Sequence, residues 1–186
     1  MLTINDIKKT YQTNQSNSAI LTGISLTITP GHTLAITGPS GSGKSTFLRT
    51  IAGLEAPDSG DVQFNNQSLY SLSDNERSLI RSNNFGFIFQ SFRLFPALNA
   101  LENVALSCEI SNIDNPETVA KEWLNEVGLT EQLHQKPETL SGGEQQRVAI
   151  ARALATNPTI ILADEPTGNL DKKNSDTIKQ LLERCI

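Results

Sequence analysis

One segment near the first third of the chain reads Gly38-Pro39-Ser40-Gly41-Ser42-Gly43-Lys44-Ser45-Thr46. It fits the pattern GxxxxGK[ST], in which glycines let the backbone turn so that successive N–H groups point at phosphate oxygens. A β-rich run at 33–37 precedes the segment, and apolar residues at helical spacing follow it over 47–52. A strand, a glycine-rich turn and a helix in this order predict a phosphate-binding loop, because the helix dipole favours an anion at its start.

Two side chains at the end of this loop predict what it binds. Lys44 offers a mobile positive charge to the β- and γ-phosphates of a nucleotide, and the Ser45 hydroxyl is a suitable ligand for Mg²⁺. The remaining positions that we expect to contact the nucleotide are Gly38, Pro39, Ser40, Gly41, Ser42, Gly43 and Thr46. A plain connecting loop is the alternative, but it would not need both the lysine and the serine.

A pair of acids follows the apolar run 160–163. A β-branched run of this kind is typical of a strand buried on both faces. Asp164, at the end of the run, is expected to hold Mg²⁺ through water, and Glu165 to accept a proton from the water that attacks the γ-phosphate. Acids at a solvated strand end are common, and only the phosphate-binding loop makes the catalytic interpretation the stronger one.

A second helix start reads Leu140-Ser141-Gly142-Gly143-Glu144. Ser141 and Glu144 form an S-x-x-E capping box, so the simplest interpretation is a capped helix. Two consecutive glycines cost helix stability, however, and they let a backbone approach an anion closely. Only the first helix start carries a lysine and a magnesium ligand. We therefore expect a dimer in which each nucleotide lies between the first site of one chain and the second site of the other.

Strands that alternate with helices predict an α/β fold with a largely parallel core sheet. Strands are expected near 2–7 and over 24–28, 33–37, 85–89 and 160–162. Helices are expected over 44–52, 74–81 and 116–127, and two more are expected to begin at 141 and near 171. The helix after Asn115-Pro116 has the clearest periodicity. We expect a single domain over 1–186, with a core formed by 1–68 and 139–186 and a helical subdomain at about 69–138.

Composition excludes several classes of protein. The chain has 186 residues, 37% of them hydrophobic, and a formal net charge of −5, which argues against a broad nucleic-acid-binding surface. The longest unbroken apolar runs are four residues, far short of a membrane span, and the N-terminus has no apolar signal-peptide core. Cys108 and Cys185 lack CxxC spacing, so we expect free thiols and a cytosolic protein.

Together these residues resemble the ATP-binding cassette (ABC) transporter ATPases, whose signature sequence LSGGE stands here at Leu140–Glu144. The resemblance extends from Leu2 to about Glu183. It implies a P-loop NTPase fold with a RecA-like core sheet, an N-terminal antiparallel β portion and an inserted helical subdomain. It also implies that ATP and Mg²⁺ are bound in a head-to-tail dimer, with Ser141 and Gly143 contacting the γ-phosphate held by the other chain.

Further positions take their expected roles from the resemblance alone. Tyr11 resembles the aromatic residue that stacks on adenine, although a surface tyrosine at a strand end is the alternative. Gln90 resembles the glutamine that contacts Mg²⁺ and the attacking water. The sequence Asn169-Leu170-Asp171 resembles the D-loop, which crosses the dimer interface, and Asp171 could equally be a helix N-cap.

The segments 89–96, 100–104 and 163–171 are similar to the ATPases of the lipoprotein-release and macrolide-export group. This similarity implies an FtsX-like membrane permease as partner, no nucleic acid, and a cytoplasmic protein peripheral to the inner face of the plasma membrane. The apolar residues that could line a groove for the permease, or equally the subdomain core, are Phe92, Leu94, Phe95 and Leu98.

The chain departs from the family pattern at its end. The pattern continues with a further strand and a switch histidine, whereas the two histidines here, His32 and His134, both precede Asp171 and are expected at the surface. We therefore expect a core sheet that lacks its last strand and a weakened ATPase. The alternatives are a cassette that binds ATP but hardly hydrolyses it, and a soluble ABC protein of DNA repair or translation.

Overall fold

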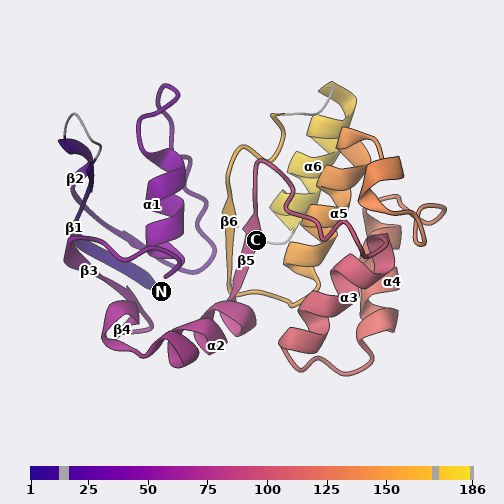
Figure 1. Ribbon diagram of the computed structural model, residues 1–186, viewed down its shortest axis with the longest axis horizontal. Helices are drawn as coiled ribbons and strands as arrows, with labels where there is room; N and C mark the ends of the chain where they lie inside the picture. The colour runs from indigo at the N-terminus through magenta and orange to yellow at the C-terminus, as the bar shows by residue number, and fades with distance from the viewer. Residues whose placement is uncertain (13–16, 169–171, 185–186) are drawn as a thin grey trace. The chain divides into compact units, whose positions relative to one another are not determined.

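The computed structural model describes residues 1–12, 17–168 and 172–184 (Figure 1). The chain forms two compact units, one over Met1–Ser78 and the other from Leu79 onward, and the boundary falls within helix α2 (Asp74–Asn84). Helix α2 starts as the sequence predicts: the Ser73 backbone N–H donates to a Glu76 carboxylate oxygen at 2.9 Å, and the Glu76 N–H donates to Ser73 Oγ at 3.4 Å.

The first unit is built on an antiparallel sheet. Its strands are β1 (Leu2–Gln12), β2 (Asn17–Ile28), β3 (Ser59–Phe64) and β4 (Gln67–Ser68), in the order β2-β1-β3-β4. Leu2 and Ile4 alternate onto the buried face of β1, and a bulge at Asp6, where φ is 45°, returns Ile7 to that face. The unit also contains helix α1 (Lys44–Ile51) and a short 3-10 helix at Leu69–Ser71. The expected N-terminal antiparallel portion is confirmed.

The strand predicted over 33–37 is wrong. The structure assigns no strand there, and Leu34 and Ile36 are 49% and 38% exposed. Within the described residues this segment has no ladder partner, so its alternating pattern buries neither face. Its β-rich composition alone was therefore a poor guide.

The second unit combines a small parallel sheet with a helical core. Strands β5 (Phe85–Ile88) and β6 (Ile160–Ala163) pair in parallel, so the α/β class is confirmed. The helices are α3 (Ala100–Ile110), α4 (Pro116–Glu126), α5 (Gly142–Leu154) and α6 (Lys172–Arg184), with a 3-10 turn at Pro137–Thr139. Fully buried side chains from three of these helices meet in the core: Val104 and Cys108 of α3, Ala120 and Leu124 of α4, and Val148 and Ile150 of α5.

Strand β6 is less buried than its sequence predicted. Only Leu162 is buried, and its three neighbours in the strand are half-buried. Within the described residues β6 pairs with β5 alone, which leaves its other edge without a strand to cover it. Strand β5 also approaches helix α5 closely. A Cβ atom added to Gly86 of β5 would lie only 2.5 Å from the carbonyl oxygen of Ala153 in α5. Backbone packs directly on backbone at this point.

Two helices complete the comparison with the sequence. Helix α3 was not predicted, although a complete capping box between Asn99 and Glu102 marks its start. Helix α6, expected from 171 onward, buries Ile178 in the core and leaves Leu182 half-buried against it. The side chain of Leu181 and the residue Cys185 lie outside what the structure describes. No helix of the described residues is long and apolar enough to cross a membrane.

Candidate functional site

The glycine-rich loop leads into α1 without a side-chain cap. Gly43 is the N-cap with φ 91°, and the first intrahelical bond runs from the Phe47 N–H to the Gly43 carbonyl at 2.8 Å. The N–H groups of the first turn therefore have no intrahelical acceptor and are donors for an anion. Lys44 Nζ donates to the carbonyls of Gly38 and Pro39 at 2.9 and 3.0 Å, which holds its positive charge across the loop. Donors and charge together fit phosphate.

Tyr11 lies at the end of β1, in the same unit as the loop. Its hydroxyl donates to the Glu55 carboxylate, the residue as a whole is 36% exposed, and Lys9 Nζ lies 6.0 Å from the ring centroid. Burial and the hydrogen bond to Glu55 raise the pKa of Tyr11, against a lowering contribution from the nearby Thr46 hydroxyl. The hydrogen bond to Glu55 therefore holds the hydroxyl in place, while the residue stays partly exposed.

Strands β5 and β6 bring Gln90 and Glu165 together. Their parallel register pairs Ile88 with Ala163, and the Asp164 N–H extends the pairing by donating to the Ile88 carbonyl at 2.9 Å. One residue further, Gln90 Nε2 donates to Glu165 Oε2 at 2.8 Å. Glu165 adopts φ 50°, an uncommon conformation for a residue other than glycine. The sequence predicted a role for each side chain but not their contact. The parallel register of β5 and β6 brings the two residues together.

The signature segment has the capping box that the sequence predicted. Ser141 is the N-cap of α5, and its backbone N–H and hydroxyl donate to Glu144 Oε2 at 2.8 and 2.7 Å. The Glu144 N–H donates to Ser141 Oγ at 3.3 Å. These hydrogen bonds from Ser141 lower the pKa of Glu144. A Cβ added at Gly142 would meet nothing within 4 Å, so this helix start is open to an approaching ligand.

The residues expected to hold Mg²⁺ have suitable chemistry. Ser45, Gln90 and Asp164 offer a hydroxyl, an amide and a carboxylate oxygen, the hard ligands that Mg²⁺ prefers. Ser45 belongs to the first unit, and Gln90 and Asp164 to the second. The described residues contain no group of three or more His, Cys, Asp or Glu that could bind a metal ion by themselves. Each of these side chains, taken by itself, is therefore a chemically suitable ligand for Mg²⁺.

The structure also locates the histidines, one cysteine and the apolar residues that the sequence singled out. His32 and His134 are exposed, as predicted, and Cys108 is a buried free thiol. The sequence Asn169-Leu170-Asp171 lies outside the described residues. The four apolar residues expected to line either a groove or the core differ in burial. Phe95 is 51% exposed, Leu94 packs on the helical core, and Phe92 and Leu98 are half-buried.

Sequence reasoning missed two residues, Asn103 and Arg152. Asn103 is fully buried, and its side chain bonds both the N–H and the carbonyl of Phe95, at 2.7 and 3.1 Å. The guanidinium of Arg152 bonds backbone carbonyls of the segment that follows Gln90. Each of the two residues is a polar position in a helix, and no local sequence feature distinguishes it from other such positions.

Comparison with known proteins defines the class. The profile of the ABC transporter family matches residues 21–168, so the chain belongs to the ABC transporter family, as one of its ATP-binding subunits. Within this family it is of the lipoprotein-release and macrolide-export type. It is 45% identical over 186 residues to the lipoprotein-releasing system ATP-binding protein LolD of Geobacter metallireducens, covering 99% of this chain and 83% of that protein.

A second relative and a solved structure agree with this assignment. The macrolide export ATP-binding/permease protein MacB of Bdellovibrio bacteriovorus is 45% identical over 184 residues, which cover 99% of this chain and 28% of that protein. The solved structure is a dimeric post-hydrolysis state of the ATP-binding cassette MJ0796 bound to ADP and Pi, with a TM-score of 0.93 and 43% identity. That match covers 98% of this chain and 81% of the other.

Proposed function

We propose that this chain binds MgATP with residues 38–46, pairs head to tail with a second copy, and hydrolyses ATP to ADP and phosphate to drive a membrane permease. The observation that carries the proposal is the 2.8 Å hydrogen bond from Gln90 to Glu165 at the carboxyl ends of two parallel strands. It pairs a carboxylate that can accept a proton with an amide that can orient a water molecule.

Each side chain has a distinct task in this proposal. Lys44 and the first-turn N–H groups of α1 bind the phosphates, and the Tyr11 ring stacks on the adenine. Glu165 accepts the proton of the attacking water, and Gln90 orients that water. Ser45, Gln90 and Asp164 would hold Mg²⁺, which neutralises developing charge on the phosphate oxygens when bound. Ser141 and Gly143 reach the γ-phosphate held by the other copy.

We also propose that the 186 residues by themselves turn over ATP slowly, since none of residues 172–186 is a histidine. In the same proposal, residues 1–68 and 139–186 form the ATPase core, and about 69–138 form the helical subdomain.

The proposed partner is an FtsX-like permease, which would hold the chain as a peripheral protein on the inner, cytoplasmic face of the plasma membrane. The names of LolD and MacB support this partner, since they describe ATP-binding components of a lipoprotein-releasing and a macrolide export system. On this chain Phe95, which is 51% exposed, is the side chain that we propose to contact the permease.

The decisive experiment measures oligomeric state. Replacing Glu165 by Gln keeps hydrogen bonding at this position but removes the proton acceptor, so the Glu165→Gln variant should bind MgATP and accumulate as a dimer in light scattering. The matched control is the double variant Lys44→Ala/Glu165→Gln, which should remain monomeric because it binds ATP weakly. A monomer at saturating MgATP for Glu165→Gln, with the permease present, would overturn the proposed mechanism.

A further inference from the structure

Residues 92 and 93, which begin two positions after Gln90, have an unusual backbone conformation. Phe92 and Arg93 have φ values of 58° and 50°, so two consecutive residues other than glycine are left-handed. Such conformations are unfavourable and persist only where their surroundings hold them.

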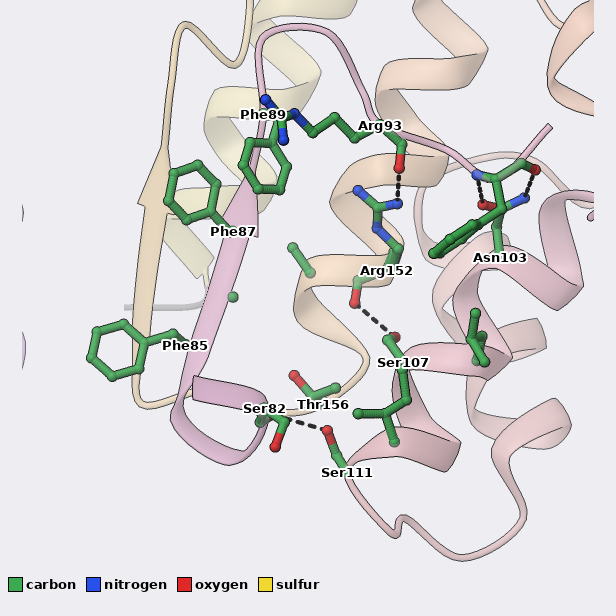
Figure 2. Close-up of a pocket in the computed structure, with 15 residues that line it drawn as sticks. Ser82, Phe85, Phe87, Phe89, Arg93, Asn103, Ser107, Ser111, Arg152 and Thr156 are labelled. Carbon is green, nitrogen blue, oxygen red and sulfur yellow. Dashed lines mark hydrogen bonds between the residues drawn. The ribbon is translucent and has the colours of Figure 1, made fainter. Parts of the chain in front are cut away.

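Arg152 of α5 supplies the principal contact. Its guanidinium donates to the carbonyl oxygen of Arg93 at 2.6 Å (Figure 2). It also donates to the carbonyl oxygen of Phe92 at 2.7 Å, so it binds the same two residues that are left-handed. The Arg152 carbonyl in turn accepts from Ser107 Oγ at 3.1 Å, which ties this turn of α5 to α3. Within the described residues no carboxylate forms an ion pair with Arg152, so backbone carbonyls alone compensate its charge.

The environment of Arg152 makes these contacts strong. Burial of its guanidinium lowers the pKa of Arg152, although an arginine remains protonated at any physiological pH. A charged donor that is partly removed from water forms stronger hydrogen bonds than an exposed one. Arg93 adds a second restraint, because its own guanidinium lies 4.7 Å from the centroid of the Phe89 ring.

The turn fixed by Arg152 is the one that carries Gln90. The Phe92 N–H donates to the Phe89 carbonyl at 3.1 Å, which closes a four-residue turn with Gln90 at its second position. Holding the carbonyl of Phe92 therefore holds the last residue of that turn. The other end of the segment is fixed separately, by the buried side chain of Asn103 at Phe95.

We propose that Arg152 is a positioning residue for Gln90: by binding the carbonyls of Phe92 and Arg93 it sets the turn from which Gln90 reaches Glu165. Because Arg152 lies ten residues after Gly142 on the same helix, about 15 Å along its axis, the signature segment and the glutamine turn are joined by one rigid element. The consequence for hydrolysis rests on the proposed function, whereas the structural restraint does not.

Hydrogen exchange tests the restraint without any nucleotide. In the Arg152→Gln variant the Phe92 amide should exchange about 10-fold faster, because the turn that protects it is released. The matched control, Ile150→Ala, removes a fully buried side chain from the same helix and should leave Phe92 exchange unchanged. Arg152→Lys keeps the charge with a single donor group, so it should give an intermediate rate, and it remains informative if Arg152→Gln does not fold. Unchanged Phe92 exchange in the folded variants would overturn the proposal.

Kinetics then test the link to the reaction. Arg152→Gln should lower kcat by about 10-fold with KM for ATP within about twofold, because misplacing Gln90 affects the chemical step and not phosphate binding. Arg152→Lys should recover part of this loss, and Ile150→Ala should keep kcat. A normal kcat in Arg152→Gln despite fast Phe92 exchange would also overturn the proposal. Absence of ATP turnover in the unaltered chain would instead contradict the proposed function, and the exchange rates would still decide the role of Arg152.

Discussion

Helices α1 and α5 both begin next to glycines, yet the two starts are built differently. At α1 the N-cap is Gly43, with no side-chain cap and no acid in the first turn. At α5 the N-cap is Ser141, and a complete capping box with Glu144 satisfies the first donors. The first start thus keeps its N–H groups for a ligand and places a lysine beside them, while the second is stable by itself.

The difference affects how each start could bind a phosphate. An anion at α1 gains the Lys44 charge and displaces no side-chain cap. An anion at α5 must compete with the Glu144 carboxylate for the Ser141 hydroxyl, which donates to it at 2.7 Å. The first site is therefore suited to bind alone, and the second to add a contact when a ligand is already held elsewhere.

The largest expected effect comes from removing the charge at α1. Lys44→Ala should weaken MgATP binding by roughly 100-fold, about 3 kcal/mol, because a charge-assisted contact to phosphate is lost. Isothermal titration calorimetry measures the change. Lys8→Ala is the matched control, since Lys8 is an exposed lysine of the same unit that pairs with Asp6. Equal MgATP affinities for Lys44→Ala and the unaltered chain would show that the lysine at the start of α1 does not distinguish this helix start from that of α5.

A smaller effect should separate the glycines at the two starts. Gly43→Ala should lower the free energy of unfolding by about 2 kcal/mol. The cause is the left-handed φ of 91° and a Cβ that would come within 2.7 Å of Ile20 Cγ2. Gly142→Ala has open space and should be neutral or stabilising by about 0.5 kcal/mol, because alanine favours a helix. Urea denaturation compares the two, and similar losses in both would show that the starts do not differ.

The smallest effect concerns the capping box of α5. Glu144→Gln should cost about 0.5 kcal/mol of stability at neutral pH, because glutamine can still accept hydrogen bonds in the capping box but lacks the negative charge that favours a helix N-terminus. The pKa of Glu144 is lowered in the folded state, so its contribution is complete above the ordinary value of 4.5 and is lost as pH falls through the lowered pKa.

Thermal unfolding of both proteins across this range tests the pH dependence. The difference in stability between the unaltered chain and Glu144→Gln should begin to narrow as pH falls below about 4.5, the ordinary pKa, and should close once pH has passed the lowered pKa of the folded state. Glu117→Gln is the control, because α4 has an acid in its first turn but no side-chain cap. A stability difference between the two proteins that stays constant at the lowest pH measured would show that an ionised Glu144 does not stabilise the helix start.

The sequence predicted those parts of the molecule that depend on short-range patterns. The capping box at Ser141, the amphipathic α4 and the glycine-rich loop are all local features, and the structure contains each of them. The meeting of Gln90 with Glu165 depended on strand register, which no single segment encodes.

The features that were missed depend on partners distant in the sequence. The segment 33–37 has a strand-like composition but no strand partner within the described residues. Helix α3 is an exception to this reason, because the capping box between Asn99 and Glu102 that marks its start is a local signal. Arg152 reads as a polar position on an amphipathic helix. Only the fold reveals that the carbonyls it binds lie about 60 positions earlier in the chain.

Gly86 sets a limit on how the second unit can vary. Its missing side chain lets β5 lie against the Ala153 carbonyl, and any added methyl group would collide with backbone and with Pro158. Rotamer changes in neighbouring residues cannot relieve a collision with main-chain atoms. Effort to stabilise this unit by filling it with larger side chains must therefore begin elsewhere, because widening the gap at Gly86 would move the glutamine turn away from the helix that holds it.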